Sequence, residues 1–153
     1  MEQQEASEDV VMTRIGQALM LLHGGDREEA RNRFGVIWAE IGEHGEPLHR
    51  CTLAHYMADA QDDAGDELAW DLRALSAADA LGRERRQTSL AVRAFYPSLH
   101  LNLAADYLKL HRPDAARIHL ERAHTALDAL DEDAYGNGIR TALLRLERQL
   151  EGA

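Results

Sequence analysis

Residues 97–130 read PSLHLNLAADYLKLHRPDAARIHLERAHTALDAL. Apolar side chains recur in this stretch with the period of a helix, and Pro113 stands where the pattern begins again. Proline suits the first turn of a helix, because its φ is already helical and its missing N–H costs no hydrogen bond there. The stretch therefore predicts two helices joined by a tight turn. Such a unit of about 34 residues cannot bury its apolar face alone and needs stacked neighbours.

The rest of the chain divides into helices at its prolines and at turns such as Gly24-Gly25. We predict helices at 7–23, 26–42, 47–61, 66–81, 86–110, 113–130 and 132–150. The fifth helix is expected to break before Pro97, because Tyr96, as the residue before a proline, disfavours the α region. Apolar residues at helical spacing support three of these helices: Ile15, Leu19 and Leu22; Leu68, Leu72 and Leu75; and Leu143, Leu146 and Leu150. The sequence thus predicts an all-α fold in one domain, 1–153.

The composition favours helices and limits the partners that the chain could bind. Of its 153 residues, 45% are hydrophobic but only 5% are aromatic. A net charge of −10 repels phosphate backbones, so we expect no nucleic-acid partner. The arginines between Arg83 and Arg93 are expected to form a solvated face. No apolar run approaches the ~18 residues of a membrane span, so no membrane partner is expected.

The cysteine count and the N-terminus indicate where the protein would reside. Cys51 is the single cysteine, which excludes an intrachain disulfide. The first nine residues are acidic and lack the basic and apolar regions of a signal peptide. We therefore expect a cytoplasmic protein.

Small residues stand in 97–130 where two helices must approach closely. In the third unit, 97–130, Leu103-Ala104 matches the Leu-Gly/Ala pair of the tetratricopeptide repeat family, and Tyr107 matches the aromatic residue of the family's first helix. The small, large and small positions of the family's second helix are matched by Ala116, Leu120 and Ala123. Residues 15–130 resemble this family. The first unit resembles the family through Ala18, Leu21, Ala30 and Phe34, and the middle unit through Leu53-Ala54, Met57 and Ala69, with about three extra residues in its turn at 62–65. The resemblance implies a right-handed superhelix of units 10–43, 47–82 and 97–130 with a capping helix at 132–150.

The resemblance also implies a concave groove, because in this family the first helix of each unit lines that surface. The second and third units would present Leu48, Cys51, Thr52, His55, Asp59, Ser98, Leu101, Asn102, Ala105 and Lys109. The first unit would add Met12, Ile15, Leu19 and Leu22, unless these are simply core residues. A groove with an apolar end and a polar end suits a helix or an extended peptide. An acidic chain favours a partner with basic residues.

One subgroup of the family clamps the C-terminal carboxylates of a peptide with lysine, asparagine and arginine side chains. The corresponding positions here are Ile15, Leu19, Thr52, Ser98 and Asn102, of which only Asn102 fits. Without cationic donors a carboxylate clamp is not expected.

Three patterns could carry other chemistry, and each has a simpler structural explanation. The eight histidines never stand three or four residues apart, so we expect no metal site, although His44, His49 and Cys51 could converge on zinc. Cys51 and His55 lie four residues apart and could form a reactive thiol, but a buried cysteine is the simpler interpretation. The acidic run 59–67 lacks the ligand order of a calcium-binding loop and is expected to be a solvated, helix-capping loop.

We therefore expect a non-enzymatic module, without catalytic residues or a cofactor, that binds a protein or peptide in its concave groove. The alternative is a small-molecule-responsive regulatory or sensor module that uses the same groove. A deep pocket near Cys51, His55 and Tyr107 would favour that alternative. The segment 82–96 is longer than a repeat linker and could join two copies into a homo-oligomer.

Overall fold

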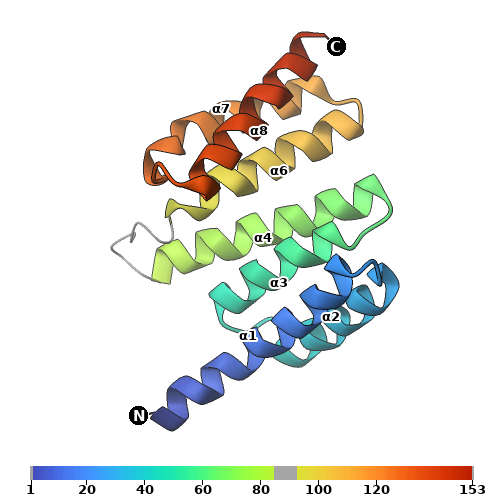
Figure 1. The fold of residues 1–153 in the computed structure, drawn as a ribbon, viewed down its shortest axis with the longest axis vertical. Helices are drawn as coiled ribbons and strands as arrows, with labels where there is room; N and C mark the ends of the chain where they lie inside the picture. Colours follow the sequence, from blue (N-terminus) through green and yellow to red (C-terminus); the bar gives the residue numbers. More distant parts are fainter. Residues whose placement is uncertain (1, 85–92, 153) are drawn as a thin grey trace.

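The chain folds into helices that stack along one long axis, in a computed structural model that describes residues 2–84 and 93–152 (Figure 1). The helices are α1 (Glu2–His23), α2 (Arg27–Ile41), α3 (Pro47–Asp59), α4 (Ala64–Glu84), α6 (Phe95–Lys109), α7 (Pro113–Thr125) and α8 (Ala134–Glu151), with a short 3-10 helix η1 (Leu127–Ala129) after α7. The described residues contain no strand. The predicted all-α fold is confirmed.

Three helical hairpins make up the stack. The pairs α1–α2, α3–α4 and α6–α7 are each joined by a short connection, which makes their helices antiparallel. The hairpins meet where α3 packs on α2 and α1 and where α6 packs on α4, and α8 closes the stack against α6 and α7 (Figure 1). Within the described ranges, no helix is both long and apolar enough to span a lipid bilayer.

The turns that close the first and third hairpins share one backbone geometry. The residue in the left-handed region is Gly25 in the first turn, with φ 94°, and His111 in the third, with φ 60°. In both turns the next N–H donates to the carbonyl five residues earlier at 2.9 Å, which satisfies an otherwise unpaired carbonyl at the helix end. The first and third units are therefore alike in their turns as well as in their apolar pattern.

The middle hairpin differs from the other two by a longer connection. Four residues, 60–63, join α3 to α4, whereas three residues join the helices of the other hairpins. The sequence predicts about three extra residues in this turn, and the helix bounds give one. Asp63 occupies the added space and caps α4, because its carboxylate accepts the N–H of Asp66 at 3.0 Å. Asp62, Asp63 and Asp66 are exposed in this helix-capping loop, as predicted, whereas Glu67 of the same run is half-buried on α4.

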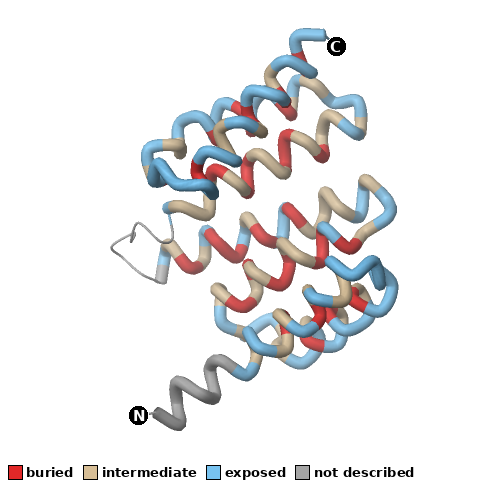
Figure 2. Tube along the Cα trace, in the orientation of Figure 1, coloured by how far each residue is buried: buried red, intermediate tan, exposed pale blue. Residues whose placement is uncertain are grey.

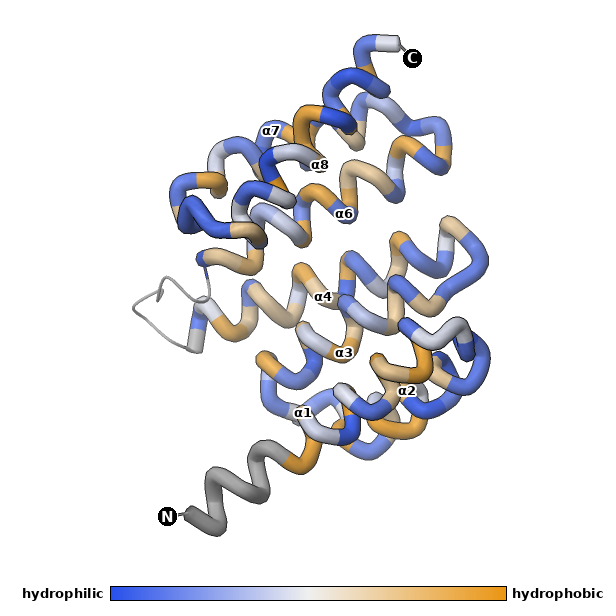
Figure 3. The backbone as a smooth tube through the Cα atoms, viewed as in Figure 1, coloured by the Kyte–Doolittle hydropathy of each residue, from blue (hydrophilic) through white to orange (hydrophobic). Residues whose placement is uncertain are grey.

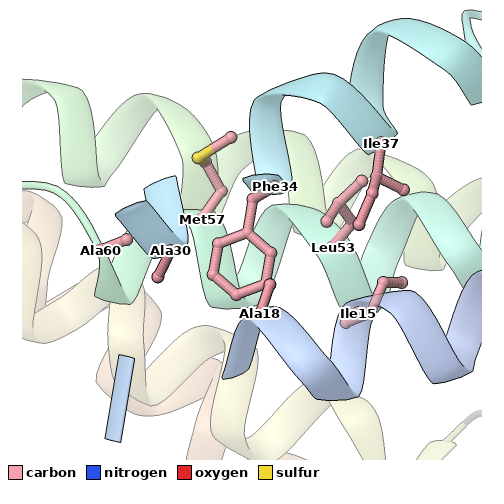
Figure 4. Packing of buried hydrophobic residues seen from close by; sticks show 8 residues of the cluster. All are labelled: Ile15, Ala18, Ala30, Phe34, Ile37, Leu53, Met57 and Ala60. Atoms are coloured by element: carbon pink, nitrogen blue, oxygen red, sulfur yellow. The ribbon is translucent and has the colours of Figure 1, made fainter. Parts of the chain in front are cut away.

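The core consists of three apolar clusters along the stack, visible as buried and hydrophobic inner faces in Figures 2 and 3. The first surrounds Phe34 between α1, α2 and α3 and contains Ile15, Ala18, Ala30, Ile37, Leu53, Met57 and Ala60 (Figure 4). The second lies between α3, α4 and α6 and contains Cys51, Ala54, Ala74, Ala77, Ala78 and Leu99. The third joins α6, α7 and α8 through Ala104, Ala116, Leu120, Ala123, Leu143, Leu146 and Leu150. The burial predicted for the small residues of unit 97–130 is confirmed.

Two details of the prediction are wrong. Leu72 is 40% exposed, because α4 turns a different face inward, along Asp71, Ala74, Ala78 and Leu81. The break before Pro97 is also misplaced, because α6 begins two residues earlier at Phe95. Proline is tolerated in this first turn, where the backbone N–H has no partner within the helix.

The oligomer contact predicted in 82–96 falls largely on 85–92, outside the described residues.

Candidate functional site

The predicted groove residues of α3 and α6 line two neighbouring hollows. The first has a volume of about 230 Å³ and is lined by Cys51, Thr52, His55, Tyr56, Phe95, Ser98, Leu99 and Tyr135. The second, also about 230 Å³, is lined by Leu101, Asn102, Ala105, Ala142, Arg145, Leu146 and Gln149. The amide nitrogen of Asn102 lies 3.3 Å from Nδ1 of His55, so one polar contact between α3 and α6 joins the two hollows.

The first hollow combines aromatic walls with small polar side chains. The Thr52 hydroxyl donates to the Leu48 carbonyl at 2.9 Å, which holds it against its own helix. Burial raises the pKa of the Cys51 thiol to about 11, so the thiol stays protonated at neutral pH. The reactive-thiol interpretation is therefore disfavoured, and His55 pairs with Asn102 instead. Tyr135 comes from α8 and is missed by the sequence analysis, which assigned α8 only a capping role.

The second hollow lies between α6 and α8. Leu101 and Ala105 are half-buried and pack against the cluster that α8 completes. Helix α8 thus occupies the side of α6 on which a further repeat would stack, and it contributes four of the seven lining residues. The capping helix is part of the candidate surface.

Three predicted groove residues, Leu48, Asp59 and Lys109, line neither hollow. Asp59 and Lys109 lie instead beside a group of acidic side chains. Nζ of Lys109 donates to Oε1 of Glu67 at 2.8 Å, which raises the pKa of Lys109. Glu67, Asp71 and Asp106 bring one carboxylate oxygen each within 4.8 Å of one another. Asp59 is exposed, and its negative charge contributes to the raised pKa values of Asp71 and Asp106.

The two aspartates of this acidic group are almost completely buried. Asp71 is 3% exposed and Asp106 is 1% exposed. Burial and, to a lesser extent, a hydrogen bond with Asp106 that holds the shared proton on Asp71 together raise the pKa of Asp71 to about 10. Burial also raises the pKa of Asp106, to about 6. Oδ2 of Asp106 is buried without a hydrogen-bond partner.

Repeat register explains why these acids are buried. Counted from the start of each second helix, Glu67 and Asp71 are the fourth and eighth residues, the positions of the core residues Ala30 and Phe34 in α2 and of Ala116 and Leu120 in α7. Asp106 follows the buried Leu99 and Leu103 of α6 by seven and three residues, on the same helix face. The sequence pattern placed Glu67 in a solvated acidic run and singled out neither Asp71 nor Asp106, and an acidic residue at a core position of the repeat is the signal that could have found them.

The apolar residues predicted for the first unit of the groove are divided between core and surface. Ile15 belongs to the core cluster around Phe34 (Figure 4), and Leu19 and Leu22 pack against that cluster while half-buried. Met12 is exposed. Ile15 is therefore a core residue and not a groove residue. The candidate surface is formed mainly by α3, α6 and α8.

A buried histidine pair occupies the opposite side of the third hairpin. Nδ1 of His100 and Nδ1 of His119 lie 3.0 Å apart, and the ring of Tyr107 stacks on His119 with centroids 5.5 Å apart. Tyr107 therefore packs away from the first hollow. Among the side chains that the structure describes, Glu67, Asp71 and Asp106 form the one group of three or more metal-binding types, so the suggested zinc cluster at His44 does not assemble there.

No family model, curated protein or solved structure matches this chain. The tetratricopeptide resemblance stays a prediction from the residues.

Proposed function

We propose that this protein is a non-enzymatic module that binds a protein segment or peptide across α3, α6 and α8. The observation that carries this proposal is the pair of adjoining hollows of about 230 Å³ each, joined by the contact between His55 and Asn102. Sites for small molecules usually measure about 300–1,000 Å³. Each hollow here is smaller than that and suits one side chain, so two neighbouring anchors of a single peptide are the best fit.

The lining residues favour particular anchor chemistry. Tyr56, Phe95 and Tyr135 offer aromatic surface in the first hollow, which suits an apolar or aromatic anchor with a polar edge near Ser98. The second hollow mixes apolar walls with Arg145 and Gln149. The protein carries a net charge of −10, so basic residues flanking the anchors would speed association, and salt would weaken this effect.

A displayed random-peptide library tests the proposal directly. We expect the full chain to select peptides with two apolar anchors, and we expect Ser98→Trp and Ala105→Trp, which fill one hollow each, to weaken their binding at least about tenfold. Ser76→Trp is the matched control, because Ser76 is an exposed small residue of α4 outside both hollows. Undiminished binding to both filled variants, with circular dichroism confirming that they fold, would refute the assignment of the surface.

A small-molecule-responsive module is the second candidate, favoured by the three aromatic residues around the first hollow. The two candidates predict different results with the same variants. A small ligand would occupy the first hollow alone, so Ser98→Trp would abolish its binding and Ala105→Trp would leave it unchanged. A peptide with two anchors would lose affinity in both variants.

A further inference from the structure

Glu67, Asp71 and Asp106 converge from two helices at the joint between the second and third hairpins. Glu67 and Asp71 stand four residues apart and therefore share one face of α4, and Asp106 comes from the facing helix α6. Their carboxylate oxygens lie within 4.8 Å of one another. Cations bound by oxygen ligands at about 2.0–2.6 Å hold those oxygens within similar distances of one another. We propose that these three carboxylates bind one divalent cation that prefers oxygen ligands, of the class of Ca²⁺, Mg²⁺ and Mn²⁺.

An unpartnered atom supports a ligand at this place independently of the clustering. Oδ2 of Asp106 is fully buried, and no N–H or hydroxyl group among the described residues donates to it, although a buried carboxylate oxygen without such a donor is strongly unfavourable. A bound cation would satisfy it. Surface acids such as Asp62 and Asp66 remain exposed and face no such cost.

The positively charged side chains near the group leave the two buried aspartates without a cationic hydrogen-bond partner among the described residues. Lys109 donates to Glu67, and among the described residues no cationic side chain donates a hydrogen bond to Asp71 or Asp106. Two buried carboxylates must therefore be neutralised by protons or by a cation. A divalent cation would supply the positive charge that the pair lacks.

The donor set selects the class of cation. All three ligands are carboxylates, which suit Ca²⁺, Mg²⁺ and Mn²⁺, whereas zinc sites of proteins are usually built from cysteine and histidine. Three side-chain ligands leave further coordination positions for water or backbone carbonyls.

Calorimetric titration of the chelator-treated full chain with CaCl₂, MgCl₂ or MnCl₂ tests the site at pH 7. We expect saturable binding with a stoichiometry of one cation per chain, whereas weak binding to exposed acids would not saturate at that stoichiometry. The melting temperature should rise by about 5–10 °C at a cation concentration 100-fold above Kd.

Asp106→Asn removes one ligand while preserving the shape of the side chain. We expect this variant to bind the cation at least about tenfold more weakly and to melt no lower than the wild-type chain without metal. Glu132→Gln is the matched control, because Glu132 is an exposed acid of the loop before α8, and it should bind like the wild-type chain. Two results would overturn the proposal. One is equal cation binding by Asp106→Asn and the wild-type chain. The other is no saturable binding of any of the three cations up to 10 mM, which is about a hundredfold above the dissociation constant of a weak site of about 0.1 mM.

Discussion

Replacing Asp71 with asparagine should stabilise the metal-free protein at neutral pH. The unfolded chain ionises this carboxyl near pH 3.8, whereas burial raises its pKa in the folded chain to about 10. The folded state therefore holds a proton that the unfolded state has lost, and stability falls as the pH rises from about 4 toward 10. Asparagine stays neutral in both states, and its amide can still donate to Asp106. The stability of the Asp71→Asn variant therefore does not fall with pH for this reason.

The size of the effect follows from the same pKa values. Each pH unit between the two pKa values contributes about 1.4 kcal/mol, so at pH 7 holding the proton on Asp71 costs about 4 kcal/mol relative to pH 4. Asp106 shares the buried proton, and we therefore expect the variant to gain about 2–4 kcal/mol at pH 7. For a chain of this length that gain corresponds to a rise of about 5–15 °C in melting temperature.

Urea denaturation at pH 4, 5.5, 7 and 8.5, in the presence of a chelator, measures the free energy of unfolding of both proteins. The difference between Asp71→Asn and wild type should be small at pH 4 and grow with each step. Asp128→Asn provides the control, because Asp128 is an exposed acid and its replacement should leave the curve unchanged. A variant that is less stable than wild type at pH 7, or a difference independent of pH, would refute the reasoning.

Four further substitutions test the geometry of the third hairpin and of α8. Burial lowers the pKa of His100 to about 4 and also lowers that of His119. As the pH falls below 6.5, the unfolded chain therefore takes up protons that the folded chain does not, and the folded state loses stability. We expect His100→Gln to remove about 2 kcal/mol of the stability loss that urea denaturation measures between pH 7 and pH 5. A Cβ on Gly136 would lie 2.1 Å from a backbone carbonyl oxygen, so Gly136→Ala should lower the free energy of unfolding by about 2–3 kcal/mol. A methyl group on Gly138 would meet no atom, so Gly138→Ala should raise the free energy of unfolding by up to about 1 kcal/mol. Thermal melts of the two variants measure both effects. His111 holds a φ of 60°, so His111→Gly should raise the melting temperature by relieving about 1 kcal/mol of backbone strain, and a lower melting temperature would contradict this.

The helices and their close contacts could be predicted because they depend on local patterns. Ala104, Ala116 and Ala123 stand at helical spacing where only small side chains allow close approach, and all three are fully buried. Prolines at the helix starts fixed the division of the chain, and α3 and α7 begin at Pro47 and Pro113 as expected. The spacing of apolar residues and the residue types of a turn are both local in the sequence, so they can be recognised without knowing how the helices pack.

The acidic group could not be predicted because it depends on contacts between helices. On α4 alone, Glu67 and Asp71 resemble a solvated face, since acids four residues apart usually point to water. Their burial appears only when the one-residue extension of the middle turn is known, because that extension places them at the core positions of the repeat. Asp106 requires the further knowledge that α6 packs on α4. Helix bounds predicted from sequence are not accurate to one residue.

The position of the acidic group gives it influence over the joint between the two halves of the stack. The cluster between α3, α4 and α6 has mostly alanine among its buried members, and larger side chains pack against it while partly buried: Trp38, Trp70, Leu75, Phe95 and Tyr96. Stability in a stack of helical hairpins is approximately a sum of the terms within units and between neighbours. Two buried carboxylates between α4 and α6 therefore make the coupling between the two halves depend on whether a proton or a cation neutralises them.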